Sequence, residues 1–160
     1  MRPGNCKECD FIIAAKKNGN KHLIKETPYS IVVLNPKLSP FLGRSAVISK
    51  YHTEYYSNLH GESLQDFFTQ VDALKVILRS AFGAVQTLDF RVRSLNEHLN
   101  FDVLPLYEHG VVRFADQEFR NPDYKNGIYI RSYKDAQPLS DDLAQKIIGA
   151  MREAYVRKNR

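Results

Sequence analysis

Hydrophobic residues between positions 62 and 82 recur at spacings of three and four, which is the period of one face of an α-helix. Gly61 precedes this run and Gly83 follows it, and glycine is the residue that most often closes a helix. We therefore predict a long helix over 62–82 whose apolar stripe lies in the core. The stripe consists of Leu64, Phe67, Phe68, Val71, Leu74, Leu78 and Phe82.

The same period returns near the C-terminal end of the sequence. Ser140 is a residue type that caps helix N-termini, and the pattern after it continues to Lys158. This predicts a second, C-terminal helix over 140–158. Its apolar positions are Leu143, Ile147, Ile148, Met151 and Tyr155.

Short runs of β-branched and aromatic residues, bounded by turn-forming residues, predict strands. Thr27-Pro28 separates the first two runs, so these are predicted to form a hairpin. Most of 1–22 and the aromatic-rich stretch 106–138 are predicted to be irregular. The order of the elements indicates an α+β domain with an antiparallel sheet. The predicted strands are 23–26, 29–34, 45–49, 87–95 and 99–105.

The last predicted strand has two different faces, because side chains alternate along a strand. Its apolar residues share one face, and its polar residues form a row on the other. The apolar set is Leu99, Phe101 and Val103, and the polar set is His98, Asn100 and Asp102.

The chain has 160 residues, of which 43% are hydrophobic, enough to build one core without disulfides. We expect a single domain over 1–160, with a core of about 6–110 and a C-terminal extension over 111–160. No apolar run approaches the roughly 20 residues of a membrane span, and the N-terminal residues lack a signal-peptide core. A soluble, cytoplasmic protein without a membrane partner is therefore expected.

Basic residues outnumber acidic ones by 23 to 18, which gives a net charge of +5. This surplus favours anionic partners such as nucleotides or phosphorylated metabolites. A solvated basic surface with no dedicated partner is the alternative, since the one basic cluster lies in the C-terminal fringe. Nucleic acid is not expected as a partner, because the other basic residues are scattered and no groove-reading helix is evident.

Cys6 and Cys9 form a C-x-x-C pair and are the only cysteines. A single disulfide is not expected in a cytosolic chain of this size. A thioredoxin-like pair would follow a strand, but only five residues precede Cys6. The remaining interpretation is half of a zinc site, which needs two further ligands.

Four pieces of sequence occur in a distinctive order. They are Cys6-Lys7-Glu8-Cys9, Val32-Val33-Leu34-Asn35-Pro36 with the later Gly43-Arg44, Val47-Ile48-Ser49-Lys50-Tyr51-His52, and His98-Leu99-Asn100-Phe101-Asp102-Val103-Leu104-Pro105. This ordered set resembles the histidine-triad superfamily, whose signature is His-x-His-x-His followed by two apolar residues. Residues 114–122 also resemble the extended tail of one bacterial branch, so the resemblance covers roughly residues 6–155.

The resemblance implies the histidine-triad fold, an antiparallel sheet with a long helix packed on it plus a C-terminal helix. It also implies hydrolysis or transfer of nucleoside monophosphate groups. In that chemistry the middle histidine attacks the α-phosphorus, because imidazole is both nucleophilic and a good leaving group near neutral pH. Superfamily members commonly pair through the long helix and a sheet edge, which implies a homodimer.

The signature is degenerate in this chain. Asn100 stands at the middle position and Asp102 at the third. The lone pair of a carboxamide nitrogen is delocalised, so Asn100 cannot replace the nucleophile, and Asp102 would repel a substrate phosphate. Leu106 stands where an arginine often follows the proline. None of the triad positions is therefore assigned as catalytic, and turnover is not expected. These positions are His98, Asn100 and Asp102.

The resemblance also supplies the two missing zinc ligands. In superfamily members with an N-terminal C-x-x-C, the first triad histidine and the histidine of the Lys-x-His segment bind zinc. This carries over to a structural site made of two thiolates and two imidazoles. The implied ligands are Cys6, Cys9, His52 and His98, whereas His22, His60 and His109 match nothing and are predicted to be surface residues.

Asn100 and Asp102 are candidates for ligand binding, together with three further residues. Asn35 matches the place where the superfamily commonly holds a group for the nucleotide ribose, although Asn-Pro is also an ordinary start of a turn. Arg91 and Arg93 would share one face of the strand beside Asn100. They could meet an anionic ligand or neutralise Asp102, or they could pair at the surface.

Three functions follow from these residues. The first is a histidine-triad-like protein without turnover that binds a nucleotide, another phosphate-bearing small molecule or a protein partner. The second is an active nucleotidyl hydrolase or transferase, of the dinucleoside polyphosphate or nucleoside phosphoramidate type, in which Asp102 attacks as a carboxylate nucleophile. The third is a basic, zinc-stapled nucleic-acid or protein interaction module.

Overall fold

The computed structural model describes most of the chain. The described residues are 6, 8–10, 12–13, 21–35, 41–91, 98–121, 124–125, 128–129 and 138–158. Across these ranges, no helix combines the length and the apolar character that crossing a membrane would require.

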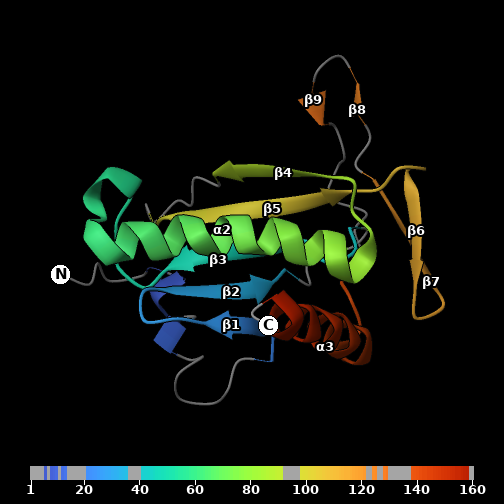
Figure 1. Cartoon of the computed structure of the whole chain (residues 1–160), viewed down its shortest axis with the longest axis horizontal. Coiled ribbons are helices and arrows are strands. Elements are labelled where there is room, and N and C mark those ends of the chain that lie inside the picture. Colours follow the sequence, from blue (N-terminus) through green and yellow to red (C-terminus); the bar gives the residue numbers. More distant parts are fainter. Residues whose placement is uncertain are drawn as a thin grey trace.

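Five strands form one antiparallel sheet in the order β1-β2-β3-β5-β4 (Figure 1). β-branched side chains pack well on a pleated surface, and they are frequent in the predicted strands 29–34 and 45–49. The predicted hairpin and the α+β class are confirmed, while the expected continuation of the fourth strand over 92–95 lies outside the described residues. The strands are β1 (Leu23–Glu26), β2 (Ser30–Leu34), β3 (Ser45–Ser49), β4 (Gln86–Arg91) and β5 (Asn100–Leu106).

Two long helices accompany the sheet, and η2 (Tyr56–Asn58) is a short 3-10 turn before the first. α2 (Gly61–Phe82) ends at Gly83 in the left-handed conformation, with φ of 70°, as its C-cap role requires. α3 (Asp141–Lys158) begins where Ser140 Oγ accepts a hydrogen bond from the Leu143 amide over 3.3 Å. Both predicted helices and both predicted caps are confirmed.

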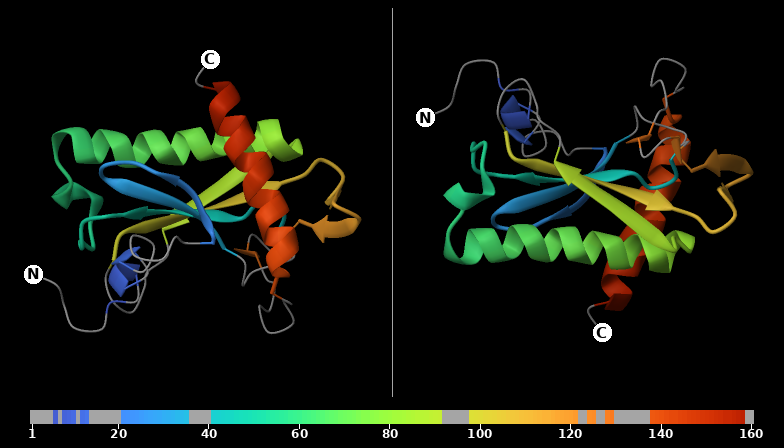
Figure 2. Two further views of the ribbon diagram at one scale, coloured as in Figure 1. Left: turned by 90° about the horizontal axis from the view of Figure 1, so that it is seen from below. Right: turned by 90° about the horizontal axis from the view of Figure 1, so that it is seen from above.

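The sheet has a helix face and a far face. α2 covers the helix face, whereas the helical residues 8–10 and 12–13 lie on the far face (Figure 2). The main core lies between sheet and helices and includes Val103 of β5 and Leu99, which precedes β5. α3 packs against α2 and β1. A second, smaller cluster covers the far face and consists of Ile12, Ile31, Val33, Ala46 and Ile48.

Three predictions need correction. The stretch 106–138 is not wholly irregular, since it contains the hairpin of β6 (Val111–Phe114) and β7 (Gln117–Arg120) and the small pair β8 (Tyr124–Lys125) and β9 (Ile128–Tyr129). Part of the N-terminal stretch is helical. Phe68 lies at the edge of the α2 stripe and is 37% exposed, whereas Ile77, outside the predicted stripe, is buried.

Gly43 connects the loop after β2 to β3 and sits against the end of α2. Its φ is +76°, and a Cβ there would lie 2.8 Å from both Leu78 Cδ2 and Phe82 Cε2. Strain and overpacking together lead us to expect that Gly43→Ala lowers the free energy of unfolding by about 2–4 kcal/mol. Urea unfolding measures this loss.

Gly149 provides the matched control, because it lies within α3 and a Cβ there meets nothing within 4 Å. Gly149→Ala should be neutral or stabilising by up to about 1 kcal/mol, since alanine is the better helix former. Equal effects of the two substitutions would contradict the close approach at Gly43.

Candidate functional site

The four predicted metal ligands come together at one end of β5. Cys6 and Cys9 are three residues apart at the N-terminal helical turn, so their side chains share one face of it. Main-chain hydrogen bonds bring the two histidine segments together, from Ser49 N to Leu99 O at 3.1 Å and from Leu99 N to Thr53 O at 2.6 Å. These contacts place His52, which follows β3, beside His98, which precedes β5.

The ligand atoms of this Cys2His2 cluster (Cys6, Cys9, His52 and His98) all lie within 4.8 Å of one another. Cys6 Sγ and Cys9 Sγ lie 3.3 and 3.5 Å from His98 Nδ1, and Cys9 Sγ lies 3.3 Å from His52 Nδ1. Neither cysteine is in a disulfide. The arrangement is a compact set of two sulfur and two nitrogen ligands.

A hydrogen bond fixes the ring of His98. Its Nε2 lies 2.7 Å from the Ser49 carbonyl oxygen, which can only accept, so Nε2 carries the proton. Nδ1 is therefore the nitrogen with the lone pair, and it faces the two thiols. Burial lowers the pKa of His98 below its ordinary value, which favours the neutral imidazole that binds metals.

The Cys6 sulfur is prepared in a similar way. Cys6 is 2% exposed, and the Cys9 backbone amide donates to its sulfur over 3.4 Å. The two sulfurs and the His98 Nδ1 lone pair therefore face one another, as ligands of one tetrahedral metal ion would.

Next to the cluster, four polar side chains line the far face of the sheet. In the strand register Asn100 is opposite Ile48, and Asp102 is opposite Ala46. Arg44 precedes β3, and its carbonyl accepts a 2.9 Å hydrogen bond from the Asn35 amide. Because side chains two residues apart share a face, Asn35, Arg44, Asp102 and Asn100 form one group, which we call the polar row.

A buried ion pair stands at the centre of the polar row. The Asp102 Oδ2 atom accepts two hydrogen bonds from the Arg44 guanidinium, from Nε at 3.1 Å and from Nη2. Asn100 is also buried, and its Nδ2 donates to the His98 carbonyl oxygen over 3.1 Å. Asn100 and Asp102, the two residues that depart from the histidine-triad signature, therefore each have a hydrogen-bond partner inside the protein.

The arginine that neutralises Asp102 is one that the sequence analysis did not select. Arg91 is opposite Phe101 in the strand register, whereas Asp102 is opposite Phe90, and Arg93 lies outside the described residues. The spacing of two from Arg44 to Ala46 and Ile48 could have indicated this partner, because side chains at that spacing share one face of a strand.

The three unassigned histidines take separate places. His60 begins α2, where its backbone amide donates to Ser63 Oγ over 3.2 Å, and it is exposed. His109 is exposed, as predicted. His22 is half-buried rather than fully at the surface, and burial lowers its pKa.

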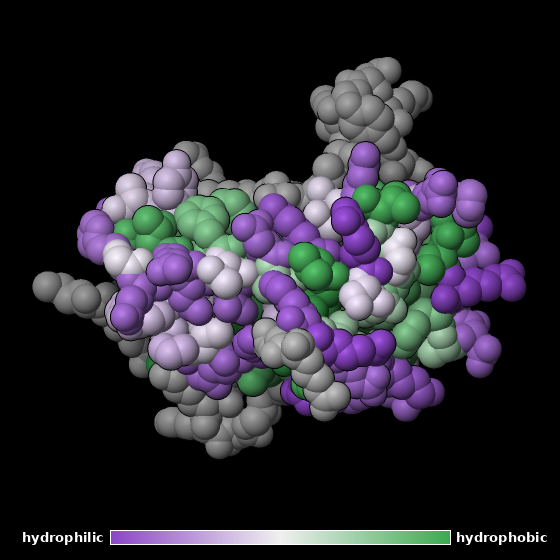
Figure 3. Space-filling model, in the orientation of Figure 1, coloured by the Kyte–Doolittle hydropathy of each residue, from purple (hydrophilic) through white to green (hydrophobic). Residues whose placement is uncertain are grey.

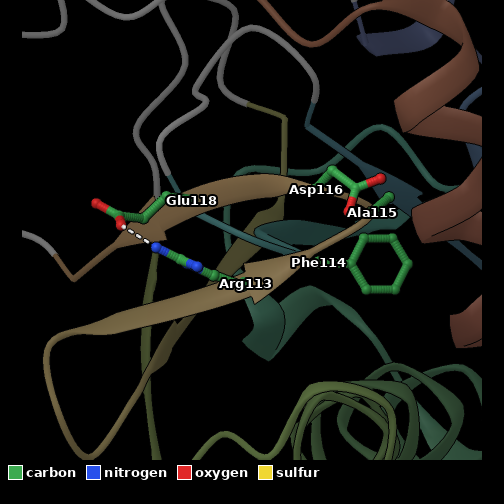
Figure 4. A pocket seen from close by; sticks show the side chains of 5 residues that line it. All are labelled: Arg113, Phe114, Ala115, Asp116 and Glu118. Atoms are coloured by element: carbon green, nitrogen blue, oxygen red, sulfur yellow. Dashed lines mark ion pairs between the residues drawn. The ribbon is translucent and has the colours of Figure 1, made fainter.

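A separate concavity lies at the β6–β7 hairpin (Figure 4). Its lining residues include none of the predicted site residues, and the ion pair between two of them, Arg113 and Glu118, spans 3.9 Å at the surface. We therefore place the candidate site at the Cys2His2 cluster and the polar row. The concavity is lined by Arg113, Phe114, Ala115, Asp116 and Glu118.

No family model matches this chain, and no curated protein matches it in sequence. Solved structures do match. A hypothetical histidine triad nucleotide-binding protein of Sulfolobus tokodaii is 18% identical with a TM-score of 0.67, over 97% of this chain and 95% of that one. A zinc-bound histidine triad family protein of Mycobacterium smegmatis is 15% identical with a TM-score of 0.62, over 94% and 95%.

A third solved structure, a histidine triad protein of Marinobacter aquaeolei, is 12% identical with a TM-score of 0.62, over 85% of this chain and 89% of that one. At these identities the likeness concerns the fold. The chain has the histidine-triad fold, as the sequence resemblance implied.

Proposed function

We propose that this chain is a histidine-triad superfamily protein that has kept a structural zinc site and lost nucleotidyl-transfer chemistry. Asn100 is the observation that carries the proposal. It stands in the middle of the signature, where the nucleophilic histidine would stand, and its amide is hydrogen-bonded to the His98 carbonyl oxygen. A carboxamide offers no nucleophilic lone pair on nitrogen.

The donor set supports zinc as the metal. Zinc prefers four sulfur and nitrogen ligands, and bond lengths of about 2.3 Å to sulfur and about 2.0 Å to nitrogen place tetrahedral ligand atoms about 3.3–3.8 Å apart. The sulfur–nitrogen distances of 3.3–3.5 Å in the Cys2His2 cluster are close to this spacing. With four protein ligands the ion would be structural, holding the N-terminal turn to the sheet.

An aspartyl mechanism finds little support in the geometry. An attacking Asp102 would need an exposed oxygen with an available lone pair, but Asp102 is 4% exposed. One of its oxygens already accepts two hydrogen bonds from Arg44. Both features make the carboxylate a poor nucleophile.

A nucleotide, or another small molecule bearing a phosphate, is the proposed ligand class. Half-buried Asn35 belongs to the polar row, and an amide can hydrogen-bond ribose hydroxyls. The Sulfolobus tokodaii protein of the same fold is described as nucleotide-binding. The net charge of +5 also favours anionic ligands.

We expect no release of nucleoside monophosphate when zinc-replete protein is incubated with dinucleoside polyphosphates and nucleoside phosphoramidates. Chromatographic assay of the released monophosphate measures it, with Asn100→His and Asp102→Asn variants in parallel. The natural chain should match the zinc-depleted control. Release above that control by the natural chain would contradict the proposal, and its loss in Asp102→Asn would assign the attack to Asp102.

The other expectations stay predictions from the sequence. These are the cytoplasmic location, the homodimer and the alternative of an interaction module. The exposed side of α2 carries separated apolar side chains, Phe68 and Val76 among them, in a mostly polar surface (Figure 3). Pairing through α2 stays the expectation that the resemblance implies, and the molar mass in solution measures it.

A further inference from the structure

The ion pair between Arg44 and Asp102 is unusual in its burial. The side chains are only 4% and 6% exposed. Lys21 and Asp141, which also form an ion pair, are 58% and 74% exposed. Removing charges from water is costly unless each finds a partner, so the two buried side chains depend on each other.

Both polar and apolar groups surround the pair. Asn35 and Asn100 flank it with amide groups that can donate and accept hydrogen bonds. The small apolar cluster of Ile31, Val33 and Ala46 adjoins it on the same face. A guanidinium, two amides and an apolar wall are brought together on the far face of the sheet.

Arginine recognises carboxylates and phosphates through the same geometry. In both cases its planar N–H groups donate short, charge-assisted hydrogen bonds to anionic oxygens. The Nε and Nη2 edge of Arg44 is directed at Asp102 Oδ2 in this way. An external anion could approach that edge only by displacing the carboxylate.

We infer that Arg44 is an anion-binding group of this site and that the Asp102 carboxylate occupies the place of its anion. Asp102 is thus an internal competitor for a phosphate or small carboxylate group at Arg44. The inference goes beyond the proposed function, because it concerns binding at one guanidinium and holds whether or not the chain turns over a nucleotide.

The test is to remove the carboxylate and supply an anion from solution. Asp102→Ala leaves Arg44 without its carboxylate and opens space beside it. We expect inorganic phosphate or formate to raise the melting temperature of this variant in a saturable way, by about 5–10 °C at a hundredfold excess over Kd. The natural protein should show no saturable rise at equal ionic strength set with chloride.

Two variants serve as controls. Asp141→Ala removes a carboxylate from the exposed pair with Lys21 and reports the general effect of the added salt. Arg44→Met combined with Asp102→Ala removes the guanidinium and should abolish the saturable rise. A rise that persists in the double variant, or a rise in Asp102→Ala no larger than in Asp141→Ala, would overturn the inference.

Asp102→Ala could also fail to fold without an anion. In that case its refolding yield is compared in phosphate and in chloride at equal ionic strength. A yield that depends on phosphate supports the inference, and a yield that is the same in both salts overturns it. Nucleotide turnover enters neither measurement, so failure here is distinguishable from failure of the proposed function.

Discussion

Removing zinc from the metal-replete protein with a chelator should lower the free energy of unfolding by about 5 kcal/mol or more. The four ligands come from three separate parts of the chain, at Cys6 and Cys9, at His52 and at His98. A bound ion would join the N-terminal turn to two segments of the sheet. Without the ion, the described residues hold the N-terminal turn to the far-face cluster through the side chain of Ile12.

Cys9→Ser gives the genetic version of the same experiment, and His109→Ala is its control. Elemental analysis should find one zinc per chain in the natural protein and in His109→Ala, and much less in Cys9→Ser. A chelator should lower the melting temperature of the natural protein and of His109→Ala, and it should leave that of Cys9→Ser unchanged. A natural protein whose melting temperature does not respond to metal removal would contradict a structural zinc.

The Cys2His2 cluster could be predicted because a C-x-x-C pair needs further ligands and the resemblance to the histidine-triad superfamily supplied His52 and His98. The two faces of β5 were equally predictable, because a strand has a period of two. Leu99 and Val103 indeed lie in the main core, whereas Asn100 and Asp102 lie on the far face.

The partner of Asp102 could not be predicted with the same means. Arg44 and Asp102 are 58 residues apart, and their contact depends on the register between β3 and β5. A slip of one residue in that register would place every side chain of a strand on the other face. The sequence pattern defines each strand and leaves the register to the packing of the whole sheet.

The β6–β7 hairpin escaped prediction for a local reason. A two-residue hairpin turn of type I′ requires positive φ at both central residues, and Asn-Gly is its usual signal. Here the turn residues are Ala115 and Asp116, with φ of 47° and 62°. Alanine rarely adopts this conformation, so the turn carried no recognisable sequence signal.

The second large effect is expected at the buried ion pair. Arg44→Met should lower the free energy of unfolding by about 3–5 kcal/mol, because it leaves the Asp102 carboxylate buried without the guanidinium. Asp102→Leu should also lower the free energy of unfolding, because it removes the buried acceptor of two Arg44 hydrogen bonds. Urea unfolding of the two single variants and of the double variant measures the coupling between them.

The double variant Arg44→Met with Asp102→Leu should recover most of the loss, since two apolar side chains of similar volume can fill the same space without unpaired charges. Lys21→Met is the matched control at an exposed pair, where the cost should stay within about 1 kcal/mol. If Arg44→Met costs no more than Lys21→Met, the pair is not buried in solution. If the double variant is as stable as the natural protein, the ion pair adds nothing to the net stability.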